Sequence, residues 1–93
     1  VKDNIFTLCN ALSTVQALRG VSFTRTDTPY STLRNIGVIA QEVEKVLPEV
    51  VRTSQDAQAS KSVAYGNITA VLIEAVKELS AKVDRIMSTL NMT

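Results

Sequence analysis

The sequence predicts a small, mainly helical α+β fold, with a few short antiparallel strands and a long C-terminal helix in a parallel coiled coil. The first observation is a set of apolar residues at 3.5-residue spacing in the last third of the chain. The second is a pair of short β-rich segments separated by the polar residues 54–60. The third is the length, since 93 residues suffice for one small domain with a marginal core.

Composition and charge exclude several classes of function. Ten basic and nine acidic residues leave a net charge of +1, which argues against nucleic-acid and anionic-membrane partners. The chain has no His and a single Cys, so a histidine base, a Cys/His zinc site and an intramolecular disulfide are excluded. No apolar stretch is long enough to span a bilayer, and no signal peptide opens the chain. We therefore expect no cofactor, no metal, and no membrane or nucleic-acid partner.

The first element is a helix whose start the sequence leaves open. Apolar residues recur at helical spacing at Ile5, Leu8, Leu12, Val15 and Leu18. Alternatively, Asn10 caps a shorter helix that starts near Ala11, and residues 2–8 are extended. In both cases Gly20 is expected to stop the helix, with Arg19 suited to the negative helix end. Cys9, in or near an apolar helix face, is expected to be a small core residue.

A strand, a loop and a short helix are expected next. Residues 21–26 alternate and are β-rich, which predicts a strand, and residues 27–32 have turn chemistry. A short apolar run, residues 35–39, leads into an amphipathic helix over residues 40–47 that Pro48 stops.

A hairpin and the last helix complete the chain. Residues 49–53 and 61–65 are predicted to pair as two strands across the polar stretch. Asn67 is the expected N-cap of the last helix. We therefore divide the chain into a small α+β part, residues 1–66, and a coiled-coil helix, residues 67–93, which together form one domain.

The last helix carries an unbroken heptad pattern, which we call the seam. Six residues step by four and three in alternation and occupy the a and d positions: Leu72, Val76, Leu79, Val83, Ile86 and Leu90. A helix that packs only on its own domain drifts off such a strict repeat. At 1.5 Å per residue the helix is roughly 35 Å long, whereas a domain of this size has a radius of gyration of about 12 Å. A helix closing over its own small sheet is the alternative.

The number of strands in the coiled coil stays open from the heptads alone. Val at a with Leu at d favours two strands, whereas Ile86 at d and Leu90 at a favour higher states. The flanking Ile73 and Ala75 are also apolar, so the first turns are expected to be buried on a broad face.

No complete catalytic constellation is present in these residues. Glu42 and Glu44 are two apart on a helix and point to different faces. Glu78, on the expected exposed side of the last helix, is placed to pair with Lys82 at i, i+4. The spacing of the three glycines does not fit a phosphate-binding loop.

Several segments, in order along nearly the whole chain, resemble the endosialidase-type C-terminal intramolecular chaperone domain of phage tailspikes, tail fibres and neck appendages. They are residues 18–23 (LRGVSF), 37–49 (GVIAQEVEKVLPE), 62–65 (SVAY) and 72–79 (LIEAVKEL). The second segment is the most specific of the four.

The resemblance implies a homotrimer that assists folding of a preceding β-rich shaft in the same polypeptide and is then released by self-cleavage. The cut falls before a serine in the motif S-D-x-R-x-K, with the serine as nucleophile and the lysine as base. Residues 1–5 match the end of this motif, so Lys2 is the implied catalytic lysine and the serine is expected four residues before Val1. The longer parent polypeptide is then a self-cleaving serine peptidase, and these 93 residues alone should be inactive.

The resemblance also implies a place of action, the host cytoplasm during phage assembly, with the domain removed from the mature particle. The rival interpretation is a structural trimerisation domain of a fibrous protein that is never cleaved. The residues before Val1 distinguish the two, because Ser-Asp at the right spacing favours self-cleavage.

Overall fold

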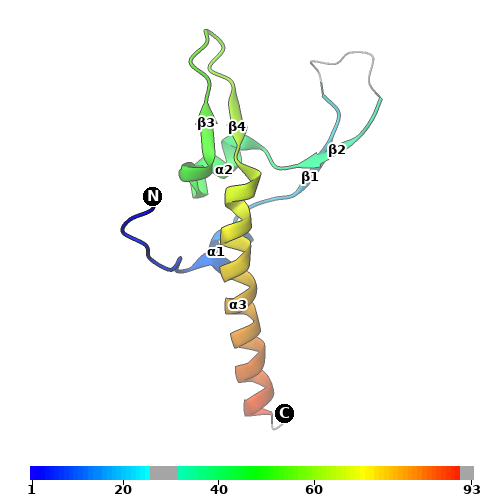
Figure 1. Ribbon diagram of the computed structural model, residues 1–93. Helices are drawn as coiled ribbons and strands as arrows, with labels where there is room; N and C mark the ends of the chain where they lie inside the picture. Colours follow the sequence, from blue (N-terminus) through cyan, green and yellow to red (C-terminus); the bar gives the residue numbers. More distant parts are fainter. Residues whose placement is uncertain (26–31, 91–93) are drawn as a thin grey trace. The chain divides into compact units, whose positions relative to one another are not determined.

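The computed structural model describes residues 1–25 and 32–90, and it confirms a mixed α+β fold with short antiparallel hairpins and a long C-terminal helix (Figure 1). The elements in order are α1 (Ala11–Gln16), β1 (Val21–Phe23), β2 (Asn35–Gly37), α2 (Ala40–Val46), the 3-10 turn η1 (Pro48–Val50), β3 (Val51–Thr53), β4 (Lys61–Val63) and α3 (Tyr65–Thr89). They form two compact units: Ala17–Ala64 is one, and Val1–Gln16 with the C-terminal helix is the other.

The Ala17–Ala64 unit contains two separate two-stranded antiparallel sheets. The predicted hairpin over residues 49–65 is confirmed as β3 and β4, with Val51 opposite Val63. The predicted strand over residues 21–26 is shorter, β1, and its partner β2 comes from an apolar run that the sequence did not identify as a strand. The Arg34 guanidinium joins these two strands by donating to the Ser22 carbonyl at 2.8 Å. Nearly all of the predicted loop over residues 27–32 lies outside the described residues.

Helix α2 is confirmed, and its apolar side forms the core of this unit. Val43 is 1% exposed, and Pro48 begins η1 just beyond the helix, as the missing N–H of proline requires. Glu42 accepts hydrogen bonds from Arg19 at 2.6 and 3.2 Å. This side-chain hydrogen bond, aided by the positive charge of Arg19, lowers the pKa of the Glu42 carboxyl. Glu44 pairs instead with Lys61 at 3.1 Å, so the two glutamates do face different partners.

In the other unit, α1 corresponds to the shorter of the two predicted helices. Residues 1–10 contain neither helix nor strand, and Asn10 adopts a left-handed φ of 57° before the helix begins. The prediction that Gly20 stops the helix is wrong. The helix ends at Gln16, and Gly20 does not have the positive φ of a helix-stopping glycine.

Helix α3 begins at Tyr65, so the predicted N-cap at Asn67 is wrong. The Ala64 N–H still donates to the Val50 carbonyl at 2.7 Å, which completes the β3–β4 hairpin, and the helix follows directly. Asn67 therefore lies inside the first turn. Among the described residues, no helix combines the length and the apolar character that crossing a bilayer requires.

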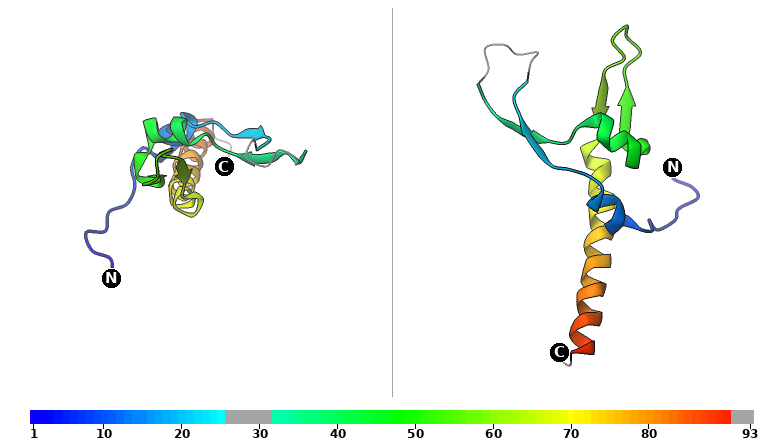
Figure 2. Two further views of the ribbon diagram at one scale, coloured as in Figure 1. Left: turned by 90° about the horizontal axis from the view of Figure 1, so that it is seen from above. Right: turned by 180° about the vertical axis from the view of Figure 1, so that it is seen from behind.

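Helices α1 and α3 pack against each other, and the three views agree in placing them side by side (Figures 1 and 2). The buried residues are Ala11 on α1 and Ile68, Val71 and Ala75 on α3. All three α3 residues lie on one flank of the helix, the c and g positions of the heptad. The packing within the chain therefore uses a different face of α3 from the seam.

Candidate functional site

The seam is uncovered in the single chain. All six of its residues are between 44% and 64% exposed, although each is a large apolar side chain. Along the C-terminal half of α3, orange to red in Figure 2, no other described element of the same unit lies beside the helix. An exposed row of large apolar side chains of this kind marks an interaction surface.

The residues beside the seam divide between two roles. Ile73 is 54% exposed and widens the apolar surface at the e position, and Met87 does the same two heptads later. Ala75, at the g position, is buried. The sequence predicted a broad apolar face that included both Ile73 and Ala75. In the structure only Ile73 of these two residues is exposed.

Glu78 has a role that the sequence did not reveal. It was predicted to be exposed and paired with Lys82, but its carboxylate is half-buried and accepts hydrogen bonds from two backbone N–H groups of α1. The donors are Ala11 at 2.8 Å and Leu12 at 3.1 Å. These N–H groups have no partner within a helix at its first turn, so Glu78 acts as a cap supplied from another helix. The contact spans more than sixty residues, and no local pattern could have indicated it.

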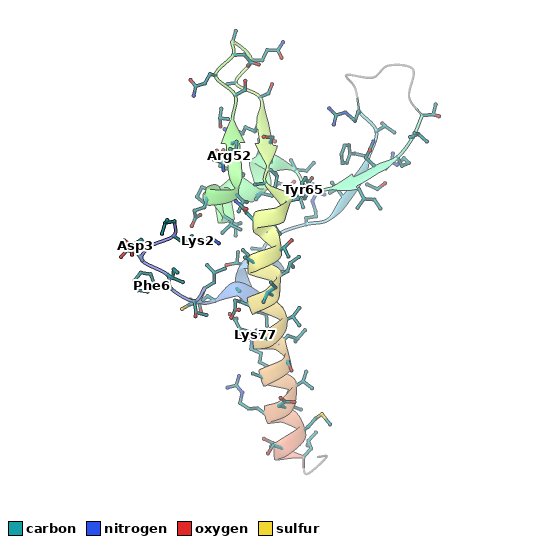
Figure 3. All side chains as sticks on the ribbon, viewed as in Figure 1. Lys2, Asp3, Phe6, Arg52, Tyr65 and Lys77 are labelled. Carbon is teal, nitrogen blue, oxygen red and sulfur yellow. The ribbon has the colours of Figure 1, made fainter. Side chains whose placement is uncertain are left out.

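Lys2 lies in the exposed segment that precedes α1 (Figure 3). Within residues 1–25 and 32–90, no hydrogen bond or ion pair holds its ammonium group. Neighbouring apolar residues of the segment, Ile5 and Phe6, are also largely exposed. The structure therefore brings no described nucleophile to Lys2.

Cys9 is exposed, and the prediction that it is a core residue is wrong. It follows Leu8 in the segment before the helix, and its thiol points to the Thr7 carbonyl oxygen at 3.7 Å. The apolar spacing that placed Cys9 on a helix face does not apply, because the helix starts two residues later. In the part of the chain that the structure describes, no cluster of three or more acidic or Cys side chains could hold a metal ion.

Comparison with known proteins identifies the family. The family model described as Chaperone of endosialidase (Peptidase S74) matches residues 1–52, more than half of the sequence. The chain therefore belongs to the chaperone-of-endosialidase family, as its motifs indicated. It is similar to the long tail fiber protein Gp37 of Enterobacteria phage K3 and to that of Enterobacteria phage T2, each 34% identical over 94 residues. These alignments cover 97% of this chain but only 8% and 7% of the two relatives, so the chain spans less than a tenth of their length.

Proposed function

We propose that this chain is the trimerisation and folding domain of a phage tail fibre, and that it is released from the fibre by self-cleavage. The uncovered seam carries the proposal. The packing of the chain leaves six large apolar residues exposed along one helix. Burying them against copies of the same chain stabilises the associated state. The family adds the function of a chaperone, and both relatives are tail fibre proteins.

Three chains, rather than two, follow from the resemblance to trimeric fibre chaperones. The structure supports a broad contact, because Ile73 lies exposed beside the seam and widens it beyond a strict a/d stripe. Wider apolar faces favour coiled coils of more than two strands. Three α3 helices held in parallel fix the register of three preceding chains, which removes a slow search from folding of the shaft.

Self-cleavage is proposed to use Lys2 as the base and a serine four residues before Val1 as the nucleophile. A lysine partly removed from water in an assembled interface can accept the serine proton, so a Ser–Lys pair needs no histidine. Lys2 lies exposed, and no partner for its ammonium group is present among residues 1–25 and 32–90, which agrees with a site that only assembly completes. Cleavage then occurs in assembled fibres, inside the host cell during phage assembly. Loss of the trimerising domain after cleavage leaves the fibre kinetically trapped in its folded state.

Expression of the complete polypeptide, beside a version truncated before Val1, tests this proposal. We expect the complete chain to yield a folded trimeric shaft and a separate domain whose first residue, by mass spectrometry, is the serine. The truncated version should aggregate. A folded trimer that keeps the domain attached would instead support the uncleaved structural trimerisation domain, and a shaft that folds equally well without the domain would refute the chaperone role.

A further inference from the structure

Glu78 connects two parts of the chain that are far apart in sequence. Its Oε2 accepts the Ala11 N–H and its Oε1 accepts the Leu12 N–H, in a part-buried contact across 67 and 66 residues. Hydrogen bonds to an ionised acceptor are roughly twice as strong as neutral ones. Ala11 is 2% exposed, so water competes poorly for its N–H. This contact therefore fixes the start of α1 on the side of α3.

Helix α1 depends on support from outside itself. It has only six residues, and a helix of that length is not stable alone in water. The Asn10 carbonyl accepts hydrogen bonds from the N–H of Thr14 and from the hydroxyls of Ser13 and Thr14. These bonds satisfy that carbonyl but supply no partner for the first N–H groups of the helix. Glu78 supplies that partner. The left-handed φ of Asn10 then sets the direction in which residues 1–9 leave the helix.

The same contact ties those residues to the seam. Glu78 adjoins Leu79, a d residue, and both belong to one continuous helix. Eight residues separate Lys2 from Ala11 along the chain. The connection from the seam to the segment that carries Lys2 thus consists of a rigid helix, two hydrogen bonds and a short stretch of backbone.

From this geometry we infer that Glu78 is a positioning residue for release of the domain. It anchors the end of the Lys2 segment that joins α1 to the flank of α3, so that association of the seams brings the start of this segment to the region where cleavage takes place. The inference rests on the proposed function. Glu78 acts through Ala11 and Leu12 and takes no part in the bond-breaking step itself.

Variants of Glu78 in the complete polypeptide test this role, with Glu74 as the matched control. Glu74 lies one turn earlier on the same helix and pairs with Lys77 at 3.4 Å. Glu78→Ala and Glu74→Ala remove the same charge, and the two Gln variants remove it while keeping the side-chain volume. Three properties are measured: release by denaturing gels over time, assembly by sedimentation, and amide hydrogen exchange of the peptide covering residues 9–16.

We expect Glu78→Ala to speed exchange in this peptide by about 10- to 100-fold, because two charge-assisted hydrogen bonds are lost. Release should slow by about 10- to 100-fold, the range that small misplacements of reacting groups produce. Assembly should be unchanged, since the seam is intact. Glu78→Gln keeps one amide oxygen that can accept an N–H, so it should fall between Glu78→Ala and the parent. Both Glu74 variants should match the parent in exchange and in release.

Each other outcome overturns a defined step. Release at the parent rate from Glu78→Ala, with exchange accelerated, overturns the positioning role and leaves the proposed function intact. Unchanged exchange overturns the anchoring itself. If Glu78→Ala fails to assemble, Glu78→Gln decides, and parent-rate release from an assembled Gln variant overturns the inference. A parent polypeptide that assembles but never releases the domain refutes the proposed self-cleavage. The denaturing gel of the parent polypeptide shows this without any variant.

Discussion

Replacement of Leu79 by Asp should abolish self-association of the chain. Leu79 lies in the middle of the seam and is 50% exposed in the single chain, so half of its surface remains to be buried by partners. Full burial of a Leu side chain contributes about 1.5–3 kcal/mol, and the remaining half therefore contributes about 1 kcal/mol per chain. An unpaired buried carboxylate costs several kcal/mol per ion, and a trimer brings three of them to one level. The total over three chains is more than about 10 kcal/mol, most of the roughly 16 kcal/mol that micromolar association of three chains represents, at about 8 kcal/mol for each of two steps.

Sedimentation equilibrium at tens of micromolar measures this effect. The control is Ala81→Asp, which places the same acid on the exposed f position of the same helix. We expect trimers for the parent and for Ala81→Asp, and monomers for Leu79→Asp. Association of Leu79→Asp at the parent level would refute the reasoning, and equal loss in both variants would assign the effect to charge or helix stability rather than to the seam. A monomeric parent would refute the proposed function. A dimeric parent would show that the residue types at the a and d positions set the number of helices in the coiled coil.

Three further predictions concern cleavage and charge. In the complete polypeptide, Lys2→Ala should slow release by about 10²–10⁴-fold without affecting assembly, and Lys2→Arg should fail too because a guanidinium stays protonated. Normal release from both on denaturing gels would exclude Lys2 as the base. The 93-residue chain alone should not react with serine-directed probes, and stoichiometric labelling of one Ser would contradict this. Arg19→Ala should raise the pKa of Glu42 in an NMR titration, because the side-chain hydrogen bond that lowers it is lost. The stabilisation from a lowered carboxyl pKa is present above the unfolded pKa and disappears as the pH falls through the folded one, so an unchanged acid-unfolding curve in this variant would argue against the pair.

Local patterns predicted those elements whose causes lie close together in sequence. The helix that ends before Pro48 and the hairpin of β3 and β4 follow from an apolar period, a proline and a polar stretch, all within a few residues. The heptad pattern also identified the seam as a surface distinct from an ordinary packed helix face. The functional assignment came from family motifs in residues 18–23 and 37–49, which lie within the part of the chain that the family model matches.

The errors have physical causes that no local pattern contains. Strand β2 includes Asn35 and Gly37, which have low strand propensity, and it forms because Val21–Phe23 offers a pairing edge. Asn67 has the chemistry of an N-cap, but the hairpin ends at Ala64 and the helix follows at once. Glu78 looked like an exposed surface residue because its partners lie at the other end of the sequence. Tertiary contacts decided each of these positions.

The long sequence separation between Ala11 and Glu78 has a consequence for synthesis of the protein on the ribosome. At translation rates of about 5–20 residues per second, Glu78 is added about 3–13 s after Ala11, because the two are 67 positions apart in the sequence. The compact unit Ala17–Ala64 is complete in the nascent chain before α3 exists. During this interval α1 has no cap, and the Lys2 segment has no fixed place. The chain therefore acquires its anchored N-terminal segment only after α3 has been translated, which delays the proposed cleavage until the helix that assembles the trimer has been made.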